Sequence, residues 1–168
     1  MKNKIYLQSY HTPVGEMVLA SYNDALCIAN WEYGKTKERI ENKIAKTLNA
    51  TYVDASSVVI DEAQKQLDEY FAGKRKVFDI PLLMVGTPFQ KSVWEALLHI
   101  PYGETASYLA QAKRIGNEKA VRAVASANGA NAISIFIPCH RIIGSNGTLT
   151  GYAGGLETKG QLLELEKG

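Results

Sequence analysis

The sequence has little cysteine, no long apolar run and almost no excess of charge. Cys27 and Cys139 are its two cysteines, too few for a disulfide framework, so we expect free thiols. No segment approaches the roughly 20 apolar residues of a membrane helix, and the opening MKNKIYLQSY lacks the apolar core of a signal peptide. A net charge of +2 is far below that of proteins that bind nucleic acid by charge alone. We therefore expect a cytoplasmic protein without a membrane partner.

The first half of the chain predicts a small α+β unit over residues 1–82. Alternating segments 4–10, 16–22 and 24–32 are separated by turn signals, which is typical of antiparallel hairpins. Apolar residues at helical spacing predict helices over 36–48 and 61–73. Cys27 lies in an alternating strand pattern, which favours a buried structural thiol.

The second half, residues 86–168, predicts a mostly helical domain. Thr87 followed by Pro88 indicates a helix start, with the threonine as N-cap and the proline in the first turn. Two short helices follow, over 105–116 with Thr105 as the expected cap and over 117–129 with Asn117. A glycine-containing turn joins them, so we expect a helix-turn-helix of winged-helix-like type, and an α+β fold for the whole chain.

The second of these short helices has unusually few large side chains. Its central side chains are mostly alanine and serine, and Arg122 is the one long side chain in the middle. Such a surface suits either close packing against another helix or insertion into a nucleic-acid groove, where a projecting side chain can enter the base stack. The composition leaves both interpretations open.

The segment SIFIPCHRIIG, residues 134–144, places reactive groups inside an apolar run. Pro138 biases Ile137 toward an extended backbone, which predicts a buried strand over 134–137 ending at the proline. If the strand continued, Cys139 and His140 would point to opposite faces. We therefore expect a turn or helix at this point, and a bend or a bridging water between thiol and imidazole.

Four interpretations of Cys139 compete. A zinc site is disfavoured because Cys27, His11 and His99 are scattered without ligand spacing, and we expect neither a metal nor a cofactor. A structural cysteine fits the apolar flanks. A cysteine protease lacks an oxyanion-loop signal. A nucleophilic thiolate is favoured, with His140 taking the proton.

An acid is needed to orient the imidazole of His140. The C-terminal amphipathic segment supplies three acids, Glu157, Glu164 and Glu166, and its leucines would dock it on the core. The residues alone do not choose among the three.

Five separated blocks carry a resemblance to a known family. They are GTPFQ at residue 86, Ser107-Tyr108, Arg122-Ala-Val, Pro138-Cys-His-Arg, and the GYAGGL that begins at residue 151. In this order, over residues 86–166, they resemble the O6-alkylguanine-DNA alkyltransferases, also called methylated-DNA–protein-cysteine methyltransferases. The first half resembles the family only loosely, through TPVGEMVLAS.

The resemblance implies a role for each matching residue. The implied catalytic group comprises the alkyl acceptor Cys139, its water-linked partners His140 and Glu166, the proton or hydrogen-bond donor Tyr108, and Asn131, which ties the helical pair to the active-site segment. The implied DNA-binding residues are Tyr108, Arg122, Ala123, Ser126 and Arg141. The implied substrate pocket comprises Ile142, Tyr152, Ala153 and Gly154.

The implied activity is repair of alkylated DNA by direct reversal. The expected partner is double-stranded DNA carrying O6-alkylguanine, with O4-alkylthymine as a second substrate. The protein is expected to act as a monomer that binds the DNA from the minor groove and flips the damaged nucleotide out. Because a thioether is a poor leaving group, each molecule is expected to act once. The alternative is a lesion-recognition module that binds DNA without transfer. Two departures from the family pattern, Ala125 for a glycine and Ala132 for a proline, leave the nucleophile untouched.

Overall fold

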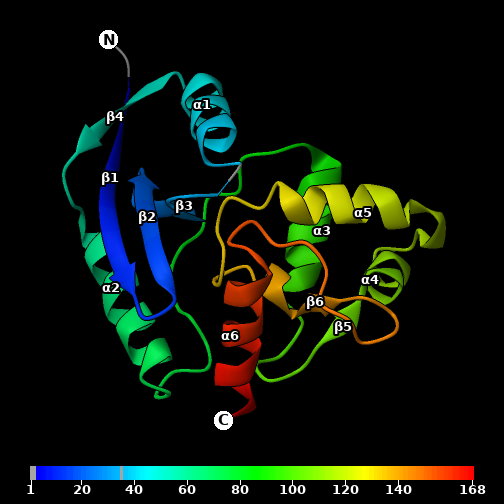
Figure 1. The fold of residues 1–168 in the computed structure, drawn as a ribbon. Coiled ribbons are helices and arrows are strands. Elements are labelled where there is room, and N and C mark those ends of the chain that lie inside the picture. Colours follow the sequence, from blue (N-terminus) through cyan, green and yellow to red (C-terminus); the bar gives the residue numbers. More distant parts are fainter. Residues whose placement is uncertain (1–2, 35) are drawn as a thin grey trace.

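The computed structural model describes residues 3–34 and 36–168 (Figure 1). Met1, Lys2 and Lys35, which belong to the first predicted unit, lie outside the described residues. The first half forms a sheet with strand order β3-β2-β1-β4. Its strands are β1 (Asn3–Thr12), β2 (Gly15–Tyr22), β3 (Ala25–Trp31) and β4 (Ala50–Asp54).

The antiparallel pairing of the first three strands is confirmed. Asn23 and Asp24 have φ values of 48° and 63°, the left-handed conformation that a two-residue hairpin turn requires and that asparagine and aspartate tolerate. The sequence pattern did not reveal β4, which pairs in parallel with β1.

Helices α1 (Lys37–Leu48) and α2 (Val58–Phe71) complete the first half. Both were predicted, but α2 begins three residues earlier than expected because Ser57 caps it, accepting a hydrogen bond from the Ile60 backbone at 3.1 Å. Helix α2 packs against the sheet and buries one face, which includes Ile60, Leu67 and Tyr70.

The second half contains α3 (Pro88–Leu97), α4 (Tyr108–Arg114), α5 (Val121–Gly129) and α6 (Leu156–Lys167), together with the short parallel pair β5 (Ala106–Ser107) and β6 (Ile142–Ile143). Helix α3 starts as predicted, with a reciprocal capping box between Thr87 and Gln90. The predicted cap of α4 at Thr105 is wrong. Ser107 caps it, because residues 106–107 first pair with β6.

Side-chain hydrogen bonds fix the helices of the second half to one another. Trp94 of α3 donates from Nε1 to the carbonyl of Ala127 in α5 at 2.8 Å. Gln111 of α4 and Asn128 of α5 exchange two amide hydrogen bonds of 2.9 Å each. These bonds hold the exposed face of α5 in a fixed position beside α4.

The two halves meet along the free edge of β3. The Ala29 amide donates to the Ala132 carbonyl at 2.9 Å, and the Ser134 amide donates to the Ala29 carbonyl at 2.7 Å. Residues 81–83 also bond to Leu26 in β3. One apolar core runs through both halves, so β3 holds the segment that leads to Cys139. Within residues 3–34 and 36–168, no helix is long and apolar enough to cross a membrane.

The strand predicted over residues 134–137 is wrong. Ile135 has a φ of 74°, and the chain turns there, so that Ser134 and Ile137 bridge each other. The Asn131 side chain holds this turn, accepting from the Ile133 amide and donating to the Ile137 carbonyl, both at 2.9 Å. An apolar run alone does not distinguish a buried turn from a strand. The predicted change to a turn or helix at Cys139 is confirmed, since residues 139–141 form a short 3₁₀ helix.

Candidate active site

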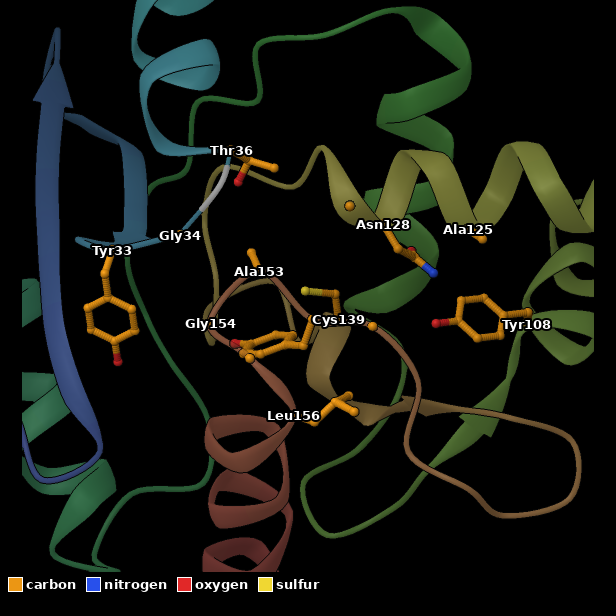
Figure 2. Close-up of a pocket in the computed structure, with 14 residues that line it drawn as sticks. Tyr33, Gly34, Thr36, Tyr108, Ala125, Asn128, Cys139, Ala153, Gly154 and Leu156 are labelled. Carbon is orange, nitrogen blue, oxygen red and sulfur yellow. The ribbon is translucent and has the colours of Figure 1, made fainter.

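Cys139 lies at a cavity of about 720 Å³ whose lining comes from both halves of the chain (Figure 2). The walls are the segment after β3, the first residue of α4, the end of α5, the loop over residues 151–155 and the first residue of α6. The Cys139 side chain is buried, with 8% of the residue exposed. The 3₁₀ helix thus presents the thiol at a space large enough for a small organic group.

The Cys139 thiol has one polar partner among the described residues. Asn131 donates from Nδ2 to Sγ at 3.3 Å. Burial raises the pKa of the thiol, while the hydrogen bond from Asn131 and the positive charge of Lys159 act in the opposite direction. The thiol is therefore protonated at rest, and attack requires a base that accepts its proton.

His140, the next residue in the chain, is held in one orientation by Glu166. Its Nε2 lies 2.7 Å from Oε2 of Glu166, and the ring is fully buried. A carboxylate at Nε2 favours the tautomer with the proton on Nε2, which leaves Nδ1 as an acceptor. In the described part of the chain Nδ1 has no hydrogen-bond partner. Burial lowers the pKa of His140 despite the opposing effect of Glu166, so the resting imidazole is neutral.

Glu166 is held by four residues from three segments of the chain. His140 and Arg141 contact it from the 3₁₀ helix, Gly103 from the loop before β5, and Tyr70 from α2. Burial alone would raise the pKa of this carboxyl, but the hydrogen bonds and positive charge around it lower the pKa to about 2. Glu166 is therefore charged and fixed in orientation.

The structure decides among the three acids of α6. Glu166 shares a buried face of the helix with Leu162 and Lys159, at spacings of three and four residues. Glu157 and Glu164 lie on the exposed side.

Arg141 does not lie on the surface, and its expected role in DNA binding is corrected. Only 6% of the residue is exposed. Its guanidinium contacts both carboxylate oxygens of Glu166, at 2.8 and 3.1 Å, and donates to the Ile100 carbonyl at 2.7 Å. The sequence block PCHR gave no sign that its arginine points inward. Arg141 is a structural cation that balances the Glu166 charge.

The expected pocket residues divide into two groups. Tyr152, Ala153 and Gly154 line the cavity with Cys139. Ile142 does not belong to the described lining; it is buried in β6, paired with Ala106. Tyr108 reaches the cavity from α4, and its hydroxyl, which lies 2.7 Å from Oγ1 of Thr150, points toward Cys139 in Figure 2.

The expected DNA-binding residues of α5 share its outer face. Arg122, Ala123 and Ser126 are exposed, as is Ala125, which also lines the cavity. Val124 and Ala127 face the core. The small residues of α5 therefore form a solvent-facing surface beside the cavity, with Arg122 as its long side chain.

Sequence reasoning missed several residues of this region. Lys159 is buried and donates from Nζ to the Thr150 carbonyl at 3.1 Å. Trp31 supports the loop by donating to the Tyr152 hydroxyl at 3.2 Å, and Tyr33 lines the cavity from the first half. Lys159 could have been found, because it lies on the same helical face as Leu162. The other two depend on how β3 meets the second half, which no local pattern reveals.

The site as a whole defines a protein with one nucleophilic cysteine. An amide donor contacts the thiol, and an imidazole oriented by a carboxylate follows it directly in the chain. In the described ranges no group of three or more histidine, cysteine, aspartate or glutamate side chains is placed to hold a metal ion. This class of site uses sulfur as the reacting atom.

Comparison with known families identifies the chain more closely. Two family models match it: 6-O-methylguanine DNA methyltransferase, ribonuclease-like domain, over residues 5–84, and 6-O-methylguanine DNA methyltransferase, DNA binding domain, over residues 88–168. The chain belongs to the 6-O-methylguanine DNA methyltransferase family.

Individual relatives match over nearly their whole length. A methylated-DNA–protein-cysteine methyltransferase of Methanosarcina acetivorans is 46% identical over 96% of this chain and 98% of that protein. The constitutive enzyme of Bacillus subtilis is 44% identical over 96% and 95%, respectively. The crystal structure of Mycobacterium tuberculosis OGT in complex with DNA is 41% identical, with a TM-score of 0.83 over 96% of this chain and 92% of that one.

Proposed function

We propose that this protein repairs alkylated DNA by transferring the alkyl group from O6 of guanine, and from O4 of thymine, to the sulfur of Cys139. The observation that carries the proposal is the contact set of Cys139: a cavity in front of the thiol, an amide donor on it, and a base with a fixed tautomer next in the chain. The names of the relatives, at 44–46% identity, support the same reaction.

The reaction is a displacement at the alkyl carbon. The Cys139 proton passes to Nδ1 of His140 through a water molecule, and Glu166 stabilises the imidazolium that forms. The thiolate then attacks the alkyl carbon, a carbon–sulfur bond forms, and the bond to the guanine oxygen breaks with its electron pair. The unpartnered Nδ1 supports this proton path, since a buried nitrogen without a protein partner suits a bridging water.

The leaving oxygen becomes easier to expel if it gains a hydrogen bond or a proton. Tyr108 supports this role because its hydroxyl lies at the cavity opposite the thiol. Thr150 is positioned to hold the phenol through the 2.7 Å contact between their oxygens. Tyr152, Ala153 and Gly154 would enclose the alkyl group, because their loop lines the cavity on the side away from Tyr108 (Figure 2).

The exposed face of α5 is the proposed DNA-binding surface. Its small residues Ala123 and Ser126 would approach the minor groove closely, with α4 and α5 acting as a helix-turn-helix. Arg122 would enter the base stack and fill the space of the flipped nucleotide. The solved complex of M. tuberculosis OGT with DNA supports DNA as the partner.

Transfer leaves a thioether on Cys139, so we propose that each molecule reacts once, as a monomer. The cytoplasmic location and the independence of residues 1–82 and 86–168 as domains stay predictions from the sequence.

Two cysteine variants test the proposal. The protein is incubated with duplex DNA that carries a labelled methyl group on O6 of guanine, and label on protein and binding to DNA are measured. We expect Cys27→Ala to transfer as the wild type does, because Cys27 is a core thiol whose pKa burial raises to about 12. Cys139→Ala should retain lesion binding and lose transfer. Label on Cys139→Ala would contradict Cys139 as the acceptor. An unlabelled wild type that still binds would support the lesion-binding alternative.

A further inference from the structure

Tyr70 of α2 reaches from the first half of the chain to the acid of the site. It is fully buried, and its hydroxyl donates to Oε2 of Glu166 at 2.5 Å. Tyr70 and Glu166 are 96 residues apart in the chain. Neither the sequence pattern nor the family blocks assigned a task to α2 beyond packing.

We propose that the Tyr70 hydroxyl is a positioning group of the Cys139–His140–Glu166 relay. Through this hydroxyl, the first half of the chain makes it harder for Cys139 to form the reactive thiolate. The proposal rests on the proposed function, because it assumes that the three residues act as a proton relay. Tyr70 would act on the thiol through Glu166 and His140, without touching the alkyl group.

The two donors share one oxygen atom. Oε2 of Glu166 accepts from Tyr70 at 2.5 Å and faces His140 Nε2 at 2.7 Å. A donor on a carboxylate stabilises its charge and weakens it as an acceptor for other donors. The hydrogen bond from Tyr70 therefore weakens the hydrogen bond that Glu166 accepts from Nε2 of His140. Without it, the imidazolium would form more easily, and so would the thiolate.

The other charged and titratable groups around His140 and Glu166 remain in place when this hydroxyl is removed. They are Cys139 and Arg141 from the 3₁₀ helix, Lys159 from α6, Tyr102 from the loop before β5, and Tyr152 from the loop before α6. Arg141 anchors both oxygens of Glu166 by itself. The change therefore affects the basicity of the relay more than the location of the carboxylate.

The ring of Tyr70 has a separate, structural role. It packs against Phe71, Phe78 and Tyr102, with centroid distances of 5.2, 5.4 and 6.1 Å. Phenylalanine keeps these contacts and removes only the oxygen. Tyr70→Phe therefore separates the hydroxyl from the packing.

The test measures the reaction of Cys139 with iodoacetamide across a pH series, without DNA, by mass spectrometry of the Cys139 peptide. For Tyr70→Phe we expect the midpoint of the pH profile to move down by about half a unit, and alkylation below the midpoint to become about threefold faster. Glu166→Gln should move the midpoint in the opposite direction. Tyr52→Phe is the matched control, since it also removes a hydrogen bond of a tyrosine hydroxyl, the part-buried bond to the Glu41 carbonyl at 2.6 Å. Its pH profile should equal that of the wild type.

A second variant covers the case in which Tyr70→Phe fails to fold. 3-Fluorotyrosine at position 70 is a more acidic phenol and a stronger donor, so it should raise the midpoint. An unchanged midpoint in the folded variant, or shifts of the opposite sign, would overturn the proposal and leave Tyr70 as a packing residue. Because iodoacetamide replaces DNA, the result is independent of transfer from alkylated DNA, and a failure of the proposed function would show only in the DNA assay.

Discussion

Cys139 and Cys27 are both buried, yet their surroundings give the two sulfur atoms different chemistry. The Cys27 thiol donates a weak hydrogen bond to the Ala20 carbonyl at 3.5 Å and lies among apolar neighbours. The Cys139 sulfur accepts from Asn131 and lies beside a cavity. An amide donor stabilises a thiolate, whereas a carbonyl acceptor stabilises the thiol. The local donors therefore select which cysteine reacts.

Replacing Glu166 by glutamine tests the relay at the residue scale. Glutamine carries no charge to stabilise the His140 imidazolium, so we expect methyl transfer to slow by at least about tenfold near pH 7 and its pH midpoint to rise. Rates of transfer from methylated duplex, measured as a pH series, check this. Glu164→Gln is the matched control, because that side chain is 75% exposed on the same helix. An unchanged pH profile in Glu166→Gln would remove this residue from the relay.

Individual site residues could be predicted where the reacting groups are neighbours in the sequence. Cys139 and His140 are sequence neighbours, and the need for a bend between them followed from strand geometry. Arg141 was misplaced because burial of an arginine depends on a carboxylate 25 residues away. Tyr70 was missed for the same reason, since its partner lies on the last helix.

At the scale of elements, α5 has an exposed face of small side chains from which one long side chain, Arg122, projects. We expect Arg122→Ala to slow repair of paired duplex by about tenfold or more and to affect a single-stranded substrate much less. The reason is that extrusion costs a few kcal/mol mainly when the target base is stacked. Transfer rates on the two substrates check the difference. Equal losses on both would contradict a role of Arg122 in extrusion.

The loop between β6 and α6 depends on a close contact at Gly154. A Cβ atom there would lie 2.8 Å from Nε1 of Trp31, a buried ring that has no room to move. We expect Gly154→Ala to shift the loop, to slow transfer severalfold and to cost about 1–3 kcal/mol of stability. Gly151→Ala is the control in the same loop, because a Cβ atom there meets nothing within 4 Å. Transfer kinetics and urea unfolding of both variants check this; equal behaviour would show that the loop tolerates the added methyl group.

Elements with a strong local signal were predictable, and those defined by distant pairing were not. The capped start of α3 and the hairpin at Asn23-Asp24 follow from a few neighbouring residues. Strand β4 depends on parallel pairing with the start of β1. The turn at Ile135 depends on the Asn131 side chain, so an apolar run was mistaken for a strand.

At the scale of the whole molecule, Glu166 joins both halves to the active site. Its pKa is about 2 in the folded chain and near 4.5 without these contacts. A lowered folded-state pKa gives stability that is complete above the unfolded value and is lost as the pH falls toward the folded value. We expect about 3 kcal/mol of unfolding free energy from this source to disappear between pH 4.5 and pH 2.

Urea unfolding as a function of pH measures this loss. The wild type and Glu164→Gln should show the same decline toward pH 2, whereas Glu166→Gln should be less stable at pH 7 and decline less on acidification. A parallel decline in all three proteins would mean that other carboxyl groups set the acid stability.

The central claim is that Cys139 accepts one alkyl group and is then spent. The most direct measurement is the number of methyl groups removed from a molar excess of O6-methylguanine duplex per molecule of protein, with mass spectrometry of the Cys139 peptide at the end point. We predict that the reaction stops at one methyl group per molecule, with the gain of one methylene on that peptide and none on the Cys27 peptide. Continued removal beyond one per molecule, or an unmodified Cys139 at the end point, would contradict the claim.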